Sequence, residues 1–411
     1  MGKSYTKSLL VSILKVFRCH ISQHYKRGLL FVIVSPFMSV RSLKDAAETC
    51  GVKTDYLYKA VNELDSFALL SNIQIEGQKR LIKHLRRLKN ADSSVKSREC
   101  VTICADDFTR KVRGDMGGLA HPCYSGADKK VVYGLNTDAL AVVIGENKDN
   151  ILLDLRVVPA KNVGFGPPGQ THIKWLQAAL ERLSAEVKSY GLSLENCYLS
   201  VDSAYASGAL FNFATKVLKL KLVSEIKSSY IVWSWFWTPI PAGIYFGWFE
   251  FIFQNKFVPL NAERKVMHLR HIIKTRVYGE ILVVPMQIDG EIKRYFASGP
   301  EMKAITIRRI AKRRWQLERI FWNMKQLLGF NLIHQQTQER VFVRIYIVFL
   351  LTQATTDCAK GLKITVNKLH LILRRDTTAL ISGVDELIAA MKPQSGKSTL
   401  DGEQPQKNNM S

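Results

Sequence analysis

Residues 100 to 223 constrain the fold more than any other part of the chain, because short apolar runs there alternate with a helical pattern. Four of these runs are rich in Val, Leu and Ile, as β-strands are. They are Val101–Ala105, Lys130–Ile144, Ile151–Val158 and Cys197–Val201. Residues Thr171–Tyr190, between the third and fourth runs, have apolar positions at helical spacing. Several strands followed by alternating helix and strand predict a mixed-sheet α/β domain.

Aspartates follow directly on two of the predicted strands. Asp106 and Asp107 come after Val101–Ala105, and Asp202 comes after Cys197–Val201. A carboxylate beside a buried strand costs desolvation energy unless it is paired or bound to metal. Strand ends are also where ligands gather in open α/β sheets. The alternative is that each aspartate caps a following helix. We take Asp106 or Asp107, together with Asp202, as candidate site residues.

A third carboxylate lies on a long predicted helix, Ile305–Leu328. Arg314, Glu318 and Lys325 occupy positions i, i+4 and i+11, so they share one helix face. The neighbouring stripe is apolar and is expected to face the core. Its members are Leu317, Phe321, Met324 and Leu328. Glu318 is therefore placed at the edge of the buried face, within reach of the strand-end aspartates. The alternative is a surface Arg–Glu pair, worth roughly a few tenths of a kcal/mol.

The N-terminal segment, to about residue 70, has helical spacing throughout. Ser42 is suited to cap a helix, with Asp45 completing a capping box. Gly51 permits the left-handed turn of a helix-turn-helix. The second helix would present side chains to a DNA groove, and the candidates are Lys53, Tyr56 and Lys59. A helical hairpin that only packs would give the same pattern.

The charge balance favours a polyanionic partner. The chain carries 59 Lys and Arg against 35 Asp and Glu, a formal net charge of +24. Nucleic acid is the commonest polyanion inside cells. Residues 78–98 are the densest basic stretch, and they predict a basic helix followed by a linker. The seven cysteines form no Cys-x-x-Cys pair, which disfavours a zinc ribbon or a secreted disulfide framework and favours a cytoplasmic protein.

Residues 228 to 300 differ in amino-acid composition from the domain that they interrupt. They are aromatic and predict strands, with three alternating tryptophans that would share one face. These are Trp233, Trp235 and Trp237. Ile281–Met286 and Lys293–Ala297, joined through Asp289-Gly290, predict a hairpin.

The run Tyr230–Phe253 is long enough to cross a bilayer, which would make the chain a membrane protein. Its interior contains Pro239, Pro241 and Glu250. These residues disfavour a membrane span, so we expect no membrane partner.

These motifs together resemble the insertion-sequence-4-like DDE transposases, bacterial transposases with a Y-R-E-K-type signature. Arg314, Glu318 and Lys325 match the last three positions of that signature, whereas Ala311 stands where the family has Tyr. The surrounding motifs are similar too. They are Asp106-Asp107 after a strand, Val201-Asp202-Ser203-Ala204-Tyr205, and Lys325-Gln326-Leu327-Leu328-Gly329. The resemblance covers about residues 40 to 360. For the first aspartate of the DDE set, the position at the strand end favours Asp106, whereas the motif Asp107-Phe108-Thr109 favours Asp107.

The resemblance implies a ribonuclease-H-like mixed-sheet catalytic core, interrupted by a β-rich insertion and preceded by an all-helical N-terminal domain. The expected division is a helical DNA-binding domain at 1–95, the first part of the core at 96–227, the insertion at 228–300, the second part of the core with C-terminal helices at 301–392, and a disordered tail at 393–411.

The resemblance also implies metal-dependent DNA strand cleavage and strand transfer. Asp106 or Asp107, Asp202 and Glu318 would hold two Mg²⁺ or Mn²⁺ ions. The expected partners are double-stranded DNA, as terminal inverted repeats and as target, and a second copy of the chain in a paired-end complex.

Two further roles follow from the same resemblance. Arg314 and Lys325 would contact the DNA backbone near the cut. An aromatic side chain of the insertion would hold a flipped base, and the candidates are Trp233, Trp235, Trp237 and Trp248. The competing function is a DNA-binding regulator, or a decayed transposase that only binds DNA.

Overall fold

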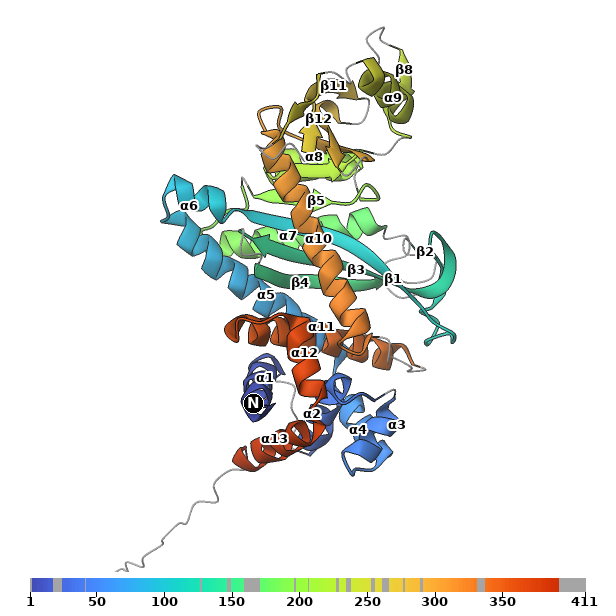
Figure 1. Cartoon of the computed structure of the whole chain (residues 1–411), viewed down its shortest axis with the longest axis vertical. Coiled ribbons are helices and arrows are strands. Elements are labelled where there is room, and N and C mark those ends of the chain that lie inside the picture. Colours follow the sequence, from blue (N-terminus) through green and yellow to red (C-terminus); the bar gives the residue numbers. More distant parts are fainter. Residues whose placement is uncertain are drawn as a thin grey trace, which may run out of the picture.

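The computed structural model describes most of the chain. The described residues are 2–17, 24–40, 42–125, 128–145, 149–158, 171–195, 197–205, 207–226, 229–233, 238–252, 256–260, 266–275, 278–288, 291–330 and 337–391. Their elements form three regions along the long axis of the molecule: a helical region, a central sheet with helices on both faces, and a β-rich region at the far end (Figure 1).

The central region contains strands at the four apolar runs: β1 (Val101–Lys111), β3 (Lys130–Ile144), β4 (Asp149–Val158) and β5 (Tyr198–Val201). Two further strands belong to it, β2 (His121–Ser125), which was not predicted, and β6 (Lys221–Glu225). β3 pairs antiparallel with β1, β2 and β4, whereas β1, β5 and β6 are parallel neighbours. This mixed sheet, with its helical N-terminal region, confirms the predicted α/β class of ribonuclease-H-like type.

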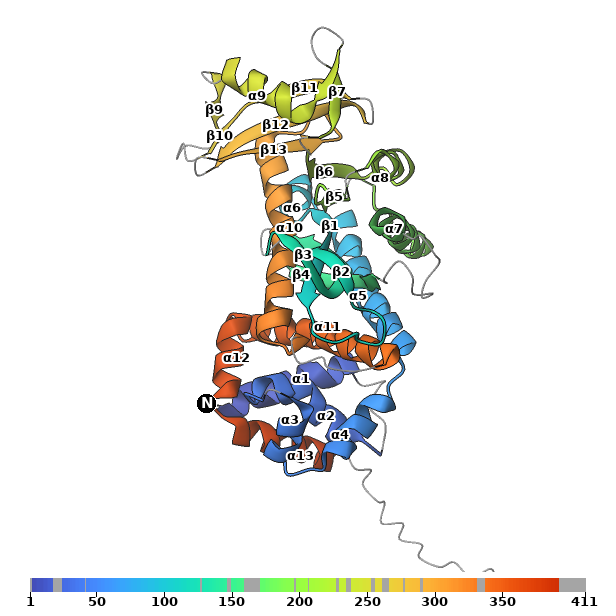
Figure 2. The same cartoon turned by 90° about the vertical axis from the view of Figure 1, so that its right-hand side faces the viewer.

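Helices cover both faces of this sheet, as Figure 2 shows. α10 (Ala304–Gln326) lies along one face. The other face is covered by α5 (Ser66–Lys89) and α7 (His172–Ser189), which Thr171 caps by accepting a hydrogen bond from the Lys174 backbone N–H. The apolar stripe expected on α10 is buried: Leu317, Phe321, Met324 and Leu328 all belong to one core cluster.

The region after β6 extends the same sheet, because β13 pairs with β6. Its elements are β7 (Ile231–Trp233), β8 (Pro239–Pro241), α9 (Ala242–Ile252), β9 (Val258–Pro259), β10 (Val266–His268), β11 (His271–Thr275), β12 (Gly279–Ile288) and β13 (Glu291–Ala297). The predicted hairpin is confirmed, since β12 and β13 pair antiparallel. Its turn, Asp289-Gly290, lies outside the described residues.

The helical region is built from both ends of the chain. From the N-terminal end come α1 (Gly2–Phe17), α2 (Lys26–Val34), the 3-10 turn Ser35–Phe37, α3 (Leu43–Thr49) and α4 (Thr54–Asn62). The short helix α6 (Ser93–Arg98) follows α5 and lies beside the central sheet instead (Figure 1). From the C-terminal end come α11 (Gln338–Gly361), α12 (Val366–Arg374) and α13 (Thr377–Ala390). α12 and α13 pack against α1 and α2, so the last helices of the chain join the first ones. An ion pair between Arg27 and Asp385 (2.7 Å) joins α2 to α13.

The predicted helix-turn-helix segment forms two helices joined at Gly51, whose φ is +64°. Ser42 caps α3 by accepting a hydrogen bond from the Asp45 backbone N–H. The N-cap of α4 is Lys53, whose side chain makes no capping hydrogen bond.

Of the described helices, α11 alone is long and apolar enough to cross a bilayer. However, 78% of its apolar window is buried inside the protein. Such burial is typical of the core helix of a globular protein.

Three local predictions were wrong. β1 does not end before Asp106 but continues to Lys111, because β3 pairs with it along its whole length. The aromatic run after Pro241 forms helix α9 where a strand was expected. Residues 93–98 form helix α6 instead of a linker, since Asp92 caps them by accepting a hydrogen bond from the Val95 backbone N–H.

Candidate active site

The parallel pairing of β1 with β5 ends at the pair Ala105–Val201. Asp106 and Asp202 are therefore the first residues beyond that pairing, in the same row of the sheet. β5 pairs with β6 in the same way, up to Val201 and Ser224. Glu225 continues the row on β6, so carboxylates follow one another at equivalent positions on β1, directly after β5 and on β6.

Asp106 and Asp107 point to opposite faces of β1, because side chains alternate along a strand. Cys104 and Phe108 share a core cluster with α10, whereas Ile103 and Ala105 belong to the cluster on the α7 face. Asp106 therefore faces α10, and Asp107 faces the opposite side.

Helix α10 brings its charged face onto the carboxylate row. Arg314 Nη1 donates to Asp106 Oδ2 at 2.6 Å and lies 3.1 Å from Glu318 Oε1. The Arg314 guanidinium, whose side chain is 13% exposed, thus bridges a buried aspartate and a glutamate whose side chain is 51% exposed. The helical spacing of Arg314 and Glu318 and the sheet position of Asp106 bring these three residues together; the sequence had left Asp106 and Asp107 as alternatives.

The electrostatics show a crowded group of carboxylates. Burial raises the pKa of Asp106 to about 7, and the charges of Asp107, Asp202 and Glu318 add to this, while Arg314 opposes it. Burial works against the charge on Arg314, yet its pKa is raised because Asp106, Asp202, Glu318 and Glu225 surround it. One arginine serves several acidic groups, which leaves this face of the sheet able to attract a further cation.

Lys325 lies farther along the same helix, against β1. Its Nζ donates to the Thr109 carbonyl oxygen at 2.9 Å and lies 5.2 Å from the centroid of the Phe108 ring. Burial lowers the pKa of Lys325. Both cations of the predicted face thus contact β1.

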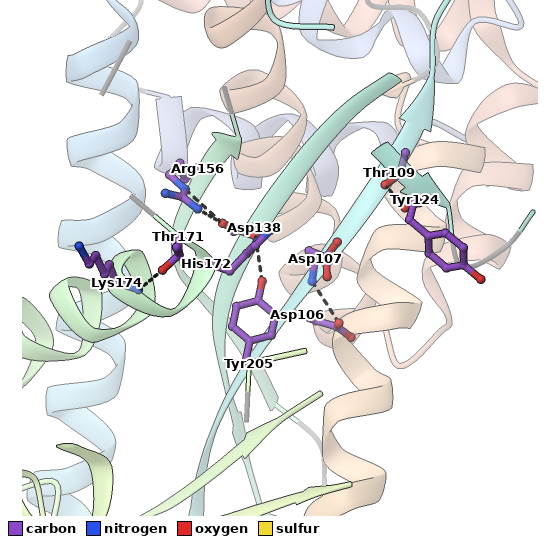
Figure 3. Close-up of polar contacts among 10 residues, drawn as sticks. All are labelled: Asp106, Asp107, Thr109, Tyr124, Asp138, Arg156, Thr171, His172, Lys174 and Tyr205. Carbon is purple, nitrogen blue, oxygen red and sulfur yellow. Dashed lines mark hydrogen bonds and ion pairs between the residues drawn. The ribbon is translucent and has the colours of Figure 1, made fainter. Parts of the chain in front are cut away.

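The opposite face of β1 has a different polar network (Figure 3). Asp138 on β3 is the cross-strand partner of Asp107 and is fully buried. Its Oδ1 accepts from His172 Nδ1 (2.5 Å) and Tyr205 Oη (2.8 Å), and its Oδ2 accepts from Arg156. Burial and the neighbouring charge of Asp138 raise the pKa of Asp107.

The donor chemistry of the α10 face suits a hard divalent cation, because carboxylate oxygens are the ligands that Mg²⁺ and Mn²⁺ prefer. In the described part of the chain, however, no three His, Cys, Asp or Glu side chains lie close enough together to hold one ion as they stand. Arg314 already holds two of the candidate ligands, Asp106 and Glu318. The carboxylate side chains are suitable ligands for such an ion. To bind it, Asp106 and Glu318 would have to leave Arg314 and move closer to Asp202.

The remaining predicted site residues that the structure describes lie away from this group. Trp248 is 66% exposed on α9, and Trp233 is half-buried on β7. Trp235 and Trp237 lie outside the described residues. Lys53 is exposed at the N-cap of α4, and Lys59 is exposed on the helix itself. Tyr56 is half-buried, and its ring centroid lies 5.4 Å from that of Tyr25.

Three nearby features escaped the sequence reasoning. Glu225 was missed because the strand pattern ended at Val223, before the polar Ser224. Trp315 and Trp322 are 47% and 50% exposed, and lie three residues before and four after Glu318. Exposed indoles at i−3 and i+4 share the face of Glu318, a spacing that was visible in the sequence.

One family model matches part of the chain. Residues 151–353 match the family model of the transposase DDE domain, a segment that contains Asp202, Arg314 and Glu318 and leaves out Asp106. The class of protein that this match supports is a DDE transposase, an enzyme class that acts on DNA. Among curated proteins, none matches this chain.

Proposed function

We propose that the chain is a cut-and-paste transposase of the insertion-sequence-4-like type, cleaving DNA with Asp106, Asp202 and Glu318. One observation carries the proposal. Asp106 and Asp202 occupy one row on the α10 face of the sheet, and Arg314 joins Asp106 to Glu318 across that face. Carboxylates from β1, from the turn after β5 and from α10 thus belong to one side of the sheet.

In this proposal the three carboxylates hold Mg²⁺ or Mn²⁺ at the α10 face. When bound, two such ions activate a water or a 3′ hydroxyl and stabilise the leaving oxygen of the phosphodiester. Glu318 is half-exposed and on a helix, so it is free to approach from the DNA side. Asp106 is buried and fixed in the sheet, so it supplies the rigid side of the site.

We propose two roles for Arg314, which are to neutralise carboxylates and to contact DNA phosphate. It neutralises Asp106 and Glu318 before an ion arrives, which limits the repulsion among carboxylates that face one another. To contact DNA phosphate, as the signature suggests, Arg314 must exchange a carboxylate for a phosphate oxygen. Lys325 must likewise release the Thr109 carbonyl.

The surface around Glu318 is suited to DNA. Trp315 and Trp322 flank Glu318, and Lys312 and Arg319 are also exposed on α10. Exposed indoles beside cations stack on bases and attract the backbone. We further propose that Lys53 and Lys59 contact DNA phosphates from the helix-turn-helix, and that terminal inverted repeats are bound by two copies of the chain.

The insertion offers one strongly exposed candidate for holding a flipped base. Trp248 is 66% exposed, whereas Trp233 is half-buried. If cleavage passes through a DNA hairpin, Trp248→Ala should abolish hairpin products while first-strand nicking continues. Trp233→Ala is the matched control, and hairpins that persist in Trp248→Ala would exclude this role.

The function is tested with DNA from the regions that flank the reading frame, where imperfect inverted repeats are expected. Wild-type protein with Mg²⁺ should nick these ends, and Asp202→Asn and Glu318→Gln should lose at least about 100-fold in rate. Both variants should still bind the ends in a gel-shift assay. If wild-type protein binds the ends without cutting them, the DNA-binding regulator or decayed transposase is the better description.

A further inference from the structure

Asp138 is a carboxylate buried inside the central sheet region. It has no exposed surface, and three side chains from three other segments donate to it. Arg156 lies on β4, His172 begins α7, and Tyr205 follows β5 (Figure 3). Arg156 Nη2 lies 2.5 Å from Asp138 Oδ2, and its Nε lies 3.1 Å from the same oxygen. Asp138 therefore ties β3, β4, α7 and the segment after β5 together.

The segment after β5 is the one that carries Asp202. The Tyr205 backbone N–H donates to the Asp202 carbonyl oxygen at 3.0 Å, so Asp202 to Tyr205 form one tight turn. The Tyr205 side chain is fully buried, and its hydroxyl donates to Asp138. On the other side of the turn, Tyr230 Oη donates to the Ser203 carbonyl oxygen at 3.3 Å. Two hydrogen bonds thus hold the turn, one to Asp138 on β3 and one from Tyr230 of the insertion.

Tyr205 and His172 both hold their protons more tightly in this network than they would in water. Burial, together with the charge of Asp138, raises the pKa of Tyr205 well above 10. The hydrogen bond to Asp138 raises the pKa of His172 above its usual value. The carboxylate of Asp138 is thus an acceptor for all of its partners, and it has no exposed surface with which to bind substrate.

We infer that Asp138 and Tyr205 are positioning residues, which hold the turn after β5 so that Asp202 stays level with Asp106 on the other face of the sheet. This inference rests on the proposed function, because it takes Asp202 as one of the cleaving carboxylates. Residues that orient metal ligands commonly change metal affinity or activity by about 10–100-fold when they are removed.

The variant that tests the inference is Tyr205→Phe, which removes one hydroxyl and keeps the buried ring. Asp138→Asn is less suitable alone, since it disturbs Arg156 and His172 as well. Tyr346→Phe is the matched control, because Tyr346 is also buried but lies in the core of the helical region on α11. Each full-length variant is compared with wild type in thermal unfolding, in Mn²⁺ titration without DNA followed by electron paramagnetic resonance, and in DNA cleavage.

Tyr205→Phe should raise the half-saturating Mn²⁺ concentration by about tenfold and lower kcat by a similar factor, with KM for DNA unchanged. High Mn²⁺ should restore part of the rate, and Tyr346→Phe should match wild type in both assays. Unchanged Mn²⁺ binding and cleavage in Tyr205→Phe would overturn the inference. So would a loss that follows a lowered Tm and appears equally in Tyr346→Phe.

The two hypotheses fail separately in this design. If wild-type protein binds Mn²⁺ but cuts no DNA, the proposed function fails, and the ratio of Mn²⁺ affinities still decides whether Tyr205 positions Asp202. If wild-type protein cuts DNA and Tyr205→Phe cuts equally well, only the positioning role fails.

Discussion

The two faces of β1 carry adjacent aspartates in opposite chemical settings. On the α10 face, Asp106 shares a single arginine with Glu318, and Asp202 and Glu225 continue its row. On the α7 face, Asp138 beside Asp107 takes hydrogen bonds from three side chains. On the α7 face three side chains donate to the one buried carboxylate of Asp138, whereas on the α10 face Asp106 and Glu318 share the guanidinium of Arg314. Under the proposed function, the α7 face holds the fold together and the α10 face binds the metal ion.

The largest expected effect separates Asp106 from Asp107. Asp106→Asn should lose at least about 100-fold in DNA cleavage, because it removes a carboxylate from the face where Glu318 lies. Asp107→Asn should retain cleavage within a few-fold, since its side chain points to the other face. Single-turnover nicking rates with equal DNA occupancy measure both. Loss of cleavage in Asp107→Asn alone would reverse the assignment.

Stability should show the opposite contrast. Arg156→Met removes the guanidinium that pairs with the buried Asp138 carboxylate, and we expect the free energy of unfolding to fall by about 3 kcal/mol. Arg314→Met should cost less, because Glu318 is half-exposed and Asp106, with a pKa of about 7, can take up a proton. Urea unfolding of both variants gives the comparison. An equal fall in the free energy of unfolding for the two variants would mean that both faces contribute equally to stability.

A smaller effect is expected at Glu225. It stands in the same row as Asp106 and Asp202, but it is separated from Asp106 by β5. Glu225→Gln should therefore reduce cleavage several-fold, well short of the loss in Asp202→Asn. A Mg²⁺ titration of the cleavage rate measures this, and a loss as large as that of Asp202→Asn would make Glu225 a full member of the site.

The smallest effect concerns pH. The hydrogen bond to Asp138 raises the pKa of His172 in the folded state above 6.5, although burial opposes this. Folding is therefore stabilised by the protonated imidazole below about pH 6.5, and this stabilisation is lost as pH rises through the raised pKa. His172→Gln should flatten the decline of Tm over that window. A decline as steep as that of wild type would show that His172 does not contribute.

Features with a local signal were predictable from the sequence. The bounds of β3 follow from an unbroken β-rich run, and the buried face of α10 follows from the spacing of Leu317, Phe321 and Met324. Arg314 and Glu318 follow from the same helix, because four residues make about one turn.

Features that depend on distant segments were not predictable. The choice between Asp106 and Asp107 needs the sheet register and the helix that covers each face. Asp138, Arg156, His172 and Tyr205 lie on four segments, and none of them repeats a local pattern. α9 was mistaken for a strand because its run is apolar and aromatic almost throughout, which leaves no clear period.

The central claim is that Asp106, Asp202 and Glu318 hold the metal ions on the α10 face. Crystals of the full-length protein soaked in Mn²⁺ test it most directly, through the anomalous scattering of the ion. The account predicts an anomalous peak between β1 and α10, with oxygens of Asp106 and Asp202 as ligands and Arg314 displaced from Asp106. A peak bound by Asp107 on the α7 face, with the Arg314–Asp106 pair intact, would contradict it.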